Sequence, residues 1–162
     1  MNRFNNTRTE LGAISATKQS MLARTNFTPA MPDVDLGIDM LAFWHDPFVA
    51  YPIQVKGTTE GFKVWEQYSH QPIIMSYVVH PLSPSPQVFL MSGAEAWELP
   101  ELYIERGGSA SDFNSDTLAN FRFPGITVLL RTILEEKYLD TTENWNRLVD
   151  MIDAVRSAVP VE

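Results

Sequence analysis

Three polar residues in the first half of the chain have the types needed to handle a phosphate group and a divalent cation. Asp39 stands near the start of the apolar run IDMLAFW, and Gln54 and Lys56 alternate within a second apolar run, YPIQVKG. An unpaired charge is costly to bury, so charged residues in such runs require an explanation. Carboxylate and amide oxygens suit Mg²⁺, and a lysine beside them can orient water or stabilise charge on a phosphate.

The elements that must position these residues begin with a β-hairpin. Asp46-Pro47 separates the two apolar runs and predicts its turn. With paired positions summing to about 95, Asp39 faces Lys56, and Gln54 lies beside them on the same face. Two interpretations stay open: a cross-strand ion pair between Asp39 and Lys56, or a metal site to which the backbone carbonyl of Val55 adds a ligand.

A helix upstream of the hairpin supplies a further carboxylate and a cluster of cations. Apolar residues at helical spacing predict an amphipathic helix over Thr9–Arg24. Glu10 on this helix is either a metal ligand or a solvated carboxylate. The first 30 residues have a net charge of +3, and their basic residues either contact nucleic-acid phosphates or form a solvated surface; they are Arg3, Arg8, Lys18 and Arg24.

The remaining sequence predicts two more strands followed by helices. The apolar runs 72–79 and 87–91 predict strands, the first of them buried. Ser92 and Glu95 form a capping-box pattern that begins a helix, which Pro100 interrupts or kinks. A helix is predicted over 126–138, with a strand as the alternative for its first part. A final helix follows Asp140. We therefore expect one domain over 1–162, an α/β fold with a mixed sheet of four to five strands flanked by helices.

The residues named above match a known pattern. The run GID followed by MLAF, then YPIQVKG, resembles the core of the PD-(D/E)XK nuclease superfamily, which has the restriction-endonuclease-like fold. In that family an acidic residue on one strand precedes an acidic or Gln residue, any residue and Lys on the next strand, and an upstream helix often adds a Glu. Glu10, Asp39, Gln54 and Lys56 match this order. The resemblance covers about 5–91, is greatest to small members such as Holliday-junction resolvases and group I intron homing endonucleases, and leaves the C-terminal helical part, about 92–162, unmatched.

The resemblance implies a Mg²⁺- or Mn²⁺-dependent endodeoxyribonuclease. In it Glu10, Asp39 and Gln54, with the Val55 carbonyl, hold the metal, and Lys56 positions or activates water. Gln54 replaces a more usual acidic residue and removes one negative charge, so the two carboxylates suffice for one divalent cation. DNA is the implied partner, and a homodimer or higher homo-oligomer is implied because cutting both strands requires two sites.

The alternative is a non-catalytic interaction module of the same fold: an inhibitor, an immunity-type protein or a subunit of a larger assembly. Gln54 and the acidic second half both favour it. The net charge is −8, and residues 1–80 carry 6 basic and 7 acidic residues whereas 81–162 carry 6 and 13. The acidity therefore lies mostly outside the proposed site.

Composition and motifs exclude several other classes. The chain has no Cys, which excludes disulfides, thiolate zinc sites and a Cys nucleophile. It lacks the phosphate-cradling GxxxxGK[ST], GxGxxG and GxSxG motifs. No apolar run approaches the ~18 residues that span a bilayer, and the polar N-terminus does not resemble a secretory signal. We expect a cytoplasmic protein with no membrane partner.

Overall fold

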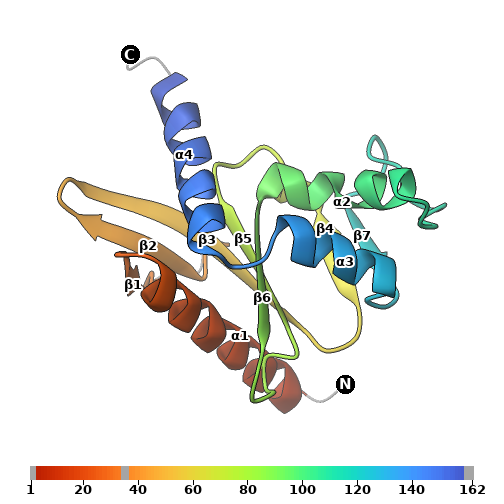
Figure 1. The fold of residues 1–162 in the computed structure, drawn as a ribbon, viewed down its shortest axis with the longest axis horizontal. Helices are drawn as coiled ribbons and strands as arrows, with labels where there is room; N and C mark the ends of the chain where they lie inside the picture. The colour runs from red at the N-terminus through yellow and green to blue at the C-terminus, as the bar shows by residue number, and fades with distance from the viewer. Residues whose placement is uncertain (1–2, 34–36, 159–162) are drawn as a thin grey trace.

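The computed structural model describes residues 3–33 and 37–158, and its centre is a five-stranded mixed sheet (Figure 1). The strand order is β1-β2-β3-β5-β6, in which β3 and β5 are parallel and the other neighbours antiparallel. These strands are β1 (Thr28–Ala30), β2 (Met40–His45), β3 (Phe48–Thr58), β5 (Ile74–Val79) and β6 (Gln87–Ser92). The expected mixed sheet of four to five strands is confirmed.

Helices and a second, two-stranded sheet cover the central sheet. The helices are α1 (Arg3–Arg24), α2 (Gly93–Glu105), α3 (Val128–Lys137) and α4 (Thr142–Ala158), with a 3-10 turn at η1 (Glu66–Tyr68). The small sheet pairs β4 (Phe62–Trp65) with β7 (Asn120–Phe123). The sequence predicted none of β1, β4 and β7.

Two apolar cores lie on opposite faces of the central sheet, because successive residues of β5 point to opposite faces. Met75, Tyr77 and Val79 pack under α2, α3 and the small sheet. Ile74 and Val78 pack against α1 and α4. All six residues of β5 are buried, as its continuous apolar run predicts.

The layer formed by α1 and α4 is joined to the sheet by a few buried polar contacts. Thr17 of α1 and Ser76 of β5 share a hydrogen bond of 2.7 Å between their hydroxyl groups. The Trp145 indole of α4 donates to the hydroxyl of Ser20 in α1 over 3.1 Å. Buried hydroxyl groups require such partners, so the first contact fixes α1 against the sheet and the second fixes α4 against α1.

The predicted hairpin is present, but its expected register is wrong by two residues. Met40 pairs with Ile53 and His45 with Phe48, so only Asp46 and Pro47 remain in the turn. Paired positions therefore sum to 93 rather than 95. A slip of two residues keeps each side chain on its predicted face. The two-residue shift in register places Asp39 beside Gln54 instead of opposite Lys56.

The predicted helices are present with altered bounds. The first begins at Arg3 rather than Thr9, and α2 continues past Pro100 to Glu105. The capping box of Ser92 and Glu95 is complete. The segment after Thr127 is helical throughout, so the strand alternative there is wrong.

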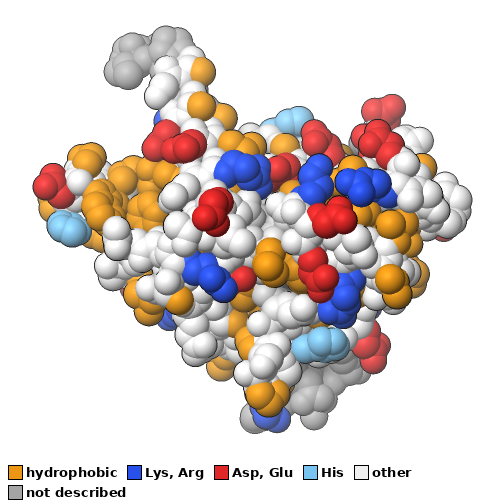
Figure 2. Space-filling view, viewed as in Figure 1, with side chains coloured by type: hydrophobic (Ala, Val, Ile, Leu, Met, Phe, Trp, Pro, Cys, Tyr) orange, Lys and Arg blue, Asp and Glu red, His pale blue; other side chains and the backbone are white. Residues whose placement is uncertain are grey.

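The tip of the β2–β3 hairpin carries exposed apolar side chains (Figure 2). Phe48 is 83% exposed and stacks on Phe43 with ring centroids 6.0 Å apart. Acidic and basic side chains are interspersed over the helices on the same view of the molecule. Among the described residues, no helix has the length and apolar character needed to cross a membrane.

Candidate functional site

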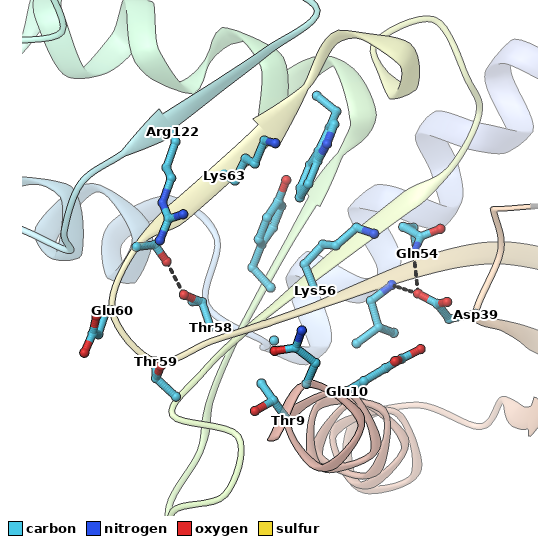
Figure 3. Close-up of a pocket in the computed structure, with 16 residues that line it drawn as sticks. Thr9, Glu10, Asp39, Gln54, Lys56, Thr58, Thr59, Glu60, Lys63 and Arg122 are labelled. Carbon is cyan, nitrogen blue, oxygen red and sulfur yellow. Dashed lines mark hydrogen bonds between the residues drawn. The ribbon is translucent and has the colours of Figure 1, made fainter. Parts of the chain in front are cut away.

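The four residues singled out in the sequence line one cleft, with a volume of about 570 Å³ (Figure 3). Glu10 comes from α1, Asp39 precedes β2, and Gln54 and Lys56 come from β3. The opposite wall belongs to the small sheet. The whole lining consists of Asn6, Thr9, Glu10, Asp39, Gln54, Val55, Lys56, Gly57, Thr58, Thr59, Glu60, Gly61, Lys63, Trp65, Tyr77 and Arg122.

The Asp39 carboxylate is held in place by two hydrogen bonds to a single oxygen. The Gln54 side-chain amide and the Val55 backbone N–H, the latter over 2.7 Å, both donate to Oδ2. Oδ1 takes part in neither bond. The N–H and C=O of one strand residue point to the same side, so the Val55 carbonyl faces the side on which Asp39 lies. This geometry follows from the register set by the two-residue turn, which pairs Met40, the first residue of β2, with Ile53 and leaves Val55 without a β2 partner.

Gln54 has a polar atom that the rest of the protein does not satisfy. Its side chain is buried, with 4% of the residue exposed, and its Oε1 has no hydrogen-bond partner among the described residues. Leaving a buried acceptor unpaired costs about 1–3 kcal/mol, so such atoms call for an explanation. Gln54 lines the cleft, and Oε1 is the acceptor of its side chain that the described residues leave unpaired.

Lys56 follows Gln54 by two residues on β3 and therefore lies on the same face of the sheet. Figure 3 shows its side chain reaching toward Gln54. Its Nζ lies 5.0 Å from the centroid of the Trp65 ring and 5.9 Å from that of Tyr68. These cation–π contacts keep the ammonium group inside the cleft.

The position of Glu10 depends on the close approach of α1 to β3. A Cβ added at Gly57 would lie 3.0 Å from the Ala13 Cβ and 3.0 Å from the Thr9 carbonyl oxygen. Only glycine at this position lets the helix lie so near the strand. In Figure 3 the carboxylates of Glu10 and Asp39 occupy the same end of the cleft.

The donors at this end of the cleft suit a hard divalent cation. They are two carboxylates, the unpartnered Gln54 Oε1 and the Val55 carbonyl, which are all oxygen ligands. The described residues contain no group of three or more His, Asp or Glu side chains placed to hold a metal. A cation here would therefore rely on the amide, the backbone and water besides the two carboxylates, as Mg²⁺ commonly does.

The predicted nucleic-acid contacts on the first helix do not line the cleft. Arg8 and Lys18 lie on α1 away from its lining, and Arg24 pairs with Asp140 over 3.1 Å at the other end of the helix. The side chain of Arg3 lies outside the described part of the chain.

The cleft also contains residues to which the sequence assigned no role in a site. Lys63 and Arg122 come from the small sheet, and Tyr77 comes from β5. The Tyr77 hydroxyl is buried with no partner among the described residues, and burial raises the pKa of Tyr77 far above its usual value. The alternation in NFRF around Arg122 is the only sequence signal for β7, and four residues are too few to identify its partner strand.

Comparisons with protein-family models, with curated proteins and with solved structures find no match for this chain. Its function is therefore argued from the cleft.

Proposed function

We propose that the protein is a divalent-metal-dependent nuclease that hydrolyses DNA phosphodiester bonds. The observation that carries the proposal is the convergence of Glu10, Asp39, Gln54 and Lys56 on one cleft from three separate segments of the chain. The unpartnered Gln54 Oε1 supports it, because a cation would satisfy that buried oxygen.

Three of these residues would bind the metal ion in this proposal. Asp39, Gln54 and Glu10, with the Val55 carbonyl, would hold Mg²⁺ or Mn²⁺. When bound, the ion supplies Lewis-acid stabilisation of the charge that develops on the phosphate. The hydrogen bonds from Gln54 and Val55 orient the Asp39 carboxylate in advance, so little reorganisation is needed when a ligand arrives.

Lys56 would act directly on the reacting groups. Its ammonium hydrogen-bonds to the attacking water or to a non-bridging phosphate oxygen, and its contact with Trp65 limits the positions it samples. The water oxygen forms a bond to phosphorus while one P–O ester bond breaks, and the water proton passes through solvent to the leaving oxygen.

The test is cleavage of duplex, branched and single-stranded DNA with Mg²⁺ or Mn²⁺. Lys56→Met and Asp39→Asn should each reduce the cleavage rate about a hundredfold or more, because each removes a group that meets charge in the transition state. Lys137→Met on α3, which removes an exposed charge away from the cleft, is the matched control and should cut like the wild type. A wild-type protein that is inert on all three substrates with both metals contradicts the proposal. If that protein still binds DNA, it favours the non-catalytic module.

A homodimer is part of the proposal, because cutting both strands of a duplex requires two clefts. The exposed Met151 and Val155 on α4 offer an apolar surface for it. Sedimentation equilibrium should give twice the 18.3 kDa of the chain. A Met151→Glu/Val155→Glu variant should sediment as a monomer, whereas a wild-type monomer would contradict this part.

A further inference from the structure

The wall of the cleft opposite Asp39 contains a pair of like charges that the fold itself does not explain. Lys63 of β4 and Arg122 of β7 are direct cross-strand partners, and both line the cleft (Figure 3). Side chains of directly opposed residues share a face of the sheet. Two cations in such positions destabilise the pair, so the arrangement needs a compensating interaction.

Acidic neighbours do not provide that compensation. Within the described residues, no carboxylate oxygen lies within 4.0 Å of the Lys63 ammonium or the Arg122 guanidinium. Other arginines do have carboxylate partners in this acidic chain: Arg24, Arg106, Arg131, Arg147 and Arg156. Arg122 therefore presents its charge to the cleft.

The fold leaves specific room for the Arg122 side chain. A Cβ at Gly61 would lie 2.8 Å from Arg122 Nε and 3.0 Å from Nη2, so the guanidinium lies against bare backbone. The Thr58 hydroxyl donates to the Gly61 carbonyl, which ties the turn before β4 to the end of β3. The position of the guanidinium is thus set by backbone, rather than by an acidic partner.

The Lys63 ammonium is positioned by the same aromatic residue that contacts Lys56. Lys63 Nζ lies 5.2 Å from the centroid of the Trp65 ring, and Lys56 Nζ lies 5.0 Å from it. Cations from β3 and β4 therefore both contact Trp65. The cleft has Glu10 and Asp39 at the α1 end, Glu60 in the turn before β4, and a cationic wall, defined here as Lys63 and Arg122, on the small sheet.

We propose that the cationic wall binds a second phosphate of the nucleic-acid strand, next to the phosphate that is cleaved beside Asp39 and Lys56. This inference rests on the proposed function for the identity of the strand. The planar guanidinium of Arg122 pairs with two phosphate oxygens, and Lys63 adds a point charge. A nucleic-acid strand has phosphates at regular intervals, so one phosphate can bind beside Lys56 while the next binds the cationic wall. A ligand with a single carboxylate would occupy only one of these two positions.

Binding of a fluorescent single-stranded oligonucleotide in EDTA tests the wall without depending on cleavage. Lys63→Gln/Arg122→Gln should weaken binding about tenfold or more, because it removes two charged contacts to the phosphate. The dependence of log K on log[salt] should become shallower by about 0.7 for the lost phosphate. Arg106→Gln/Lys137→Gln, which removes the same charge away from the cleft, should change neither value appreciably.

Gly61→Ala provides a second variant that keeps every charge. Its added methyl group meets the flexible Arg122 side chain, which must move, and lies 3.2 Å from the Phe123 carbonyl oxygen, so binding should weaken several-fold with only a small fall in melting temperature. Gly125→Ala is the matched control, because no heavy atom lies within 4 Å of its added Cβ. It should bind like the wild type.

The outcomes separate the wall from the nuclease proposal. If the wall variants lose affinity with the reduced salt dependence while the wild type cuts nothing, the wall stands and the nuclease proposal fails. If the wild type cuts and the wall variants bind as tightly as it does, the wall proposal fails and the nuclease stands. Equal weakening by the Arg106/Lys137 control also contradicts the wall, since it would show a general charge effect.

Discussion

Gln54 is the residue whose chemical type most affects what the cleft can bind. Its amide nitrogen donates to Asp39, and its oxygen has no partner within the described chain. A glutamate at this position could not donate, and it would place a second carboxylate against Asp39. The two carboxylates would repel each other in the absence of a cation, and both would bind a cation that is present.

Gln54→Glu should therefore lower the stability of the metal-free protein and increase its stabilisation by Mg²⁺. We expect a loss of about 1–3 kcal/mol in EDTA, partly or fully recovered at millimolar Mg²⁺. Urea unfolding with and without Mg²⁺ measures both effects. Gln67→Glu, on an exposed residue of η1, is the control and should show neither. A Gln54→Glu protein that is equally unstable in Mg²⁺ and in EDTA would contradict a cation site here.

Tyr77 offers a test at the same scale that does not involve metal. Its hydroxyl is buried without a partner, whereas the Tyr103 hydroxyl lies 3.1 Å from that of Thr127. Tyr77→Phe removes an unsatisfied group and should leave stability unchanged or raise it by up to about 1 kcal/mol. Tyr103→Phe should cost about 1 kcal/mol, because it breaks a hydrogen bond. Chemical denaturation of both variants checks the difference, and a large loss at Tyr77 would mean that its hydroxyl has a partner.

At the scale of the elements, the site depends on how closely α1 approaches β3. Gly57→Ala would place a methyl group 3.0 Å from both the Thr9 carbonyl and the Ala13 Cβ, which are parts of a rigid helix. The helix must then move away and take Glu10 with it. We expect a loss of about 1–3 kcal/mol in stability, since overpacking has that typical cost.

Cleavage activity should respond to Gly57→Ala more than folding does. The variant should stay folded by circular dichroism and lose several-fold in cleavage rate, because a displacement of a few tenths of an ångström in α1 moves Glu10 relative to Asp39. Gly125→Ala again provides the control. Unchanged cleavage would show that the reaction does not require Glu10 to be close to Asp39.

Some of these elements could be predicted from the sequence and others could not. The predictable ones pair segments that are neighbours in the sequence, whereas the others pair distant segments. The β2–β3 hairpin is formed by neighbouring segments around a two-residue turn, so its existence and faces could be inferred from residue type alone. The pairing of Lys63 with Arg122 joins distant segments, and it depends on α2 and the following loop returning β7 to β4. Glu10, Asp39, Gln54 and Lys56 could thus be identified from the sequence, but the cationic wall could not.

For the molecule as a whole, the net charge of −8 should make nucleic-acid binding depend on divalent cations. Phosphates entering the cleft would meet Glu10 and Asp39 as well as the cations, and an ion bound between the two carboxylates would remove that repulsion. Oligonucleotide affinity should therefore be higher in millimolar Mg²⁺ than in NaCl of equal ionic strength. The measurement uses the Lys56→Met variant, which keeps Asp39 but should not cleave the oligonucleotide. Equal affinity in the two salts would contradict the cation's role in binding.

The buried tyrosines predict how the stability of the whole fold depends on alkaline pH. Burial, with a smaller effect from Glu95, raises the pKa of Tyr138 to about 12, and burial raises the pKa of Tyr77 further. A tyrosine in the unfolded chain ionises near pH 10. Between pH 10 and pH 12 the unfolded state therefore loses protons that the folded state retains, so stability is complete below pH 10 and falls as the pH rises.

Urea unfolding at pH 8, 10 and 11 should show this fall. Tyr138→Phe should make the decline between pH 10 and pH 11 less steep than in the wild type, because phenylalanine has no proton to lose. Deprotonation of lysines acts equally in both proteins and does not affect that comparison. An identical decline in the two proteins would show that Tyr138 ionises in the folded state as readily as in the unfolded one, and would contradict its desolvation against Glu95.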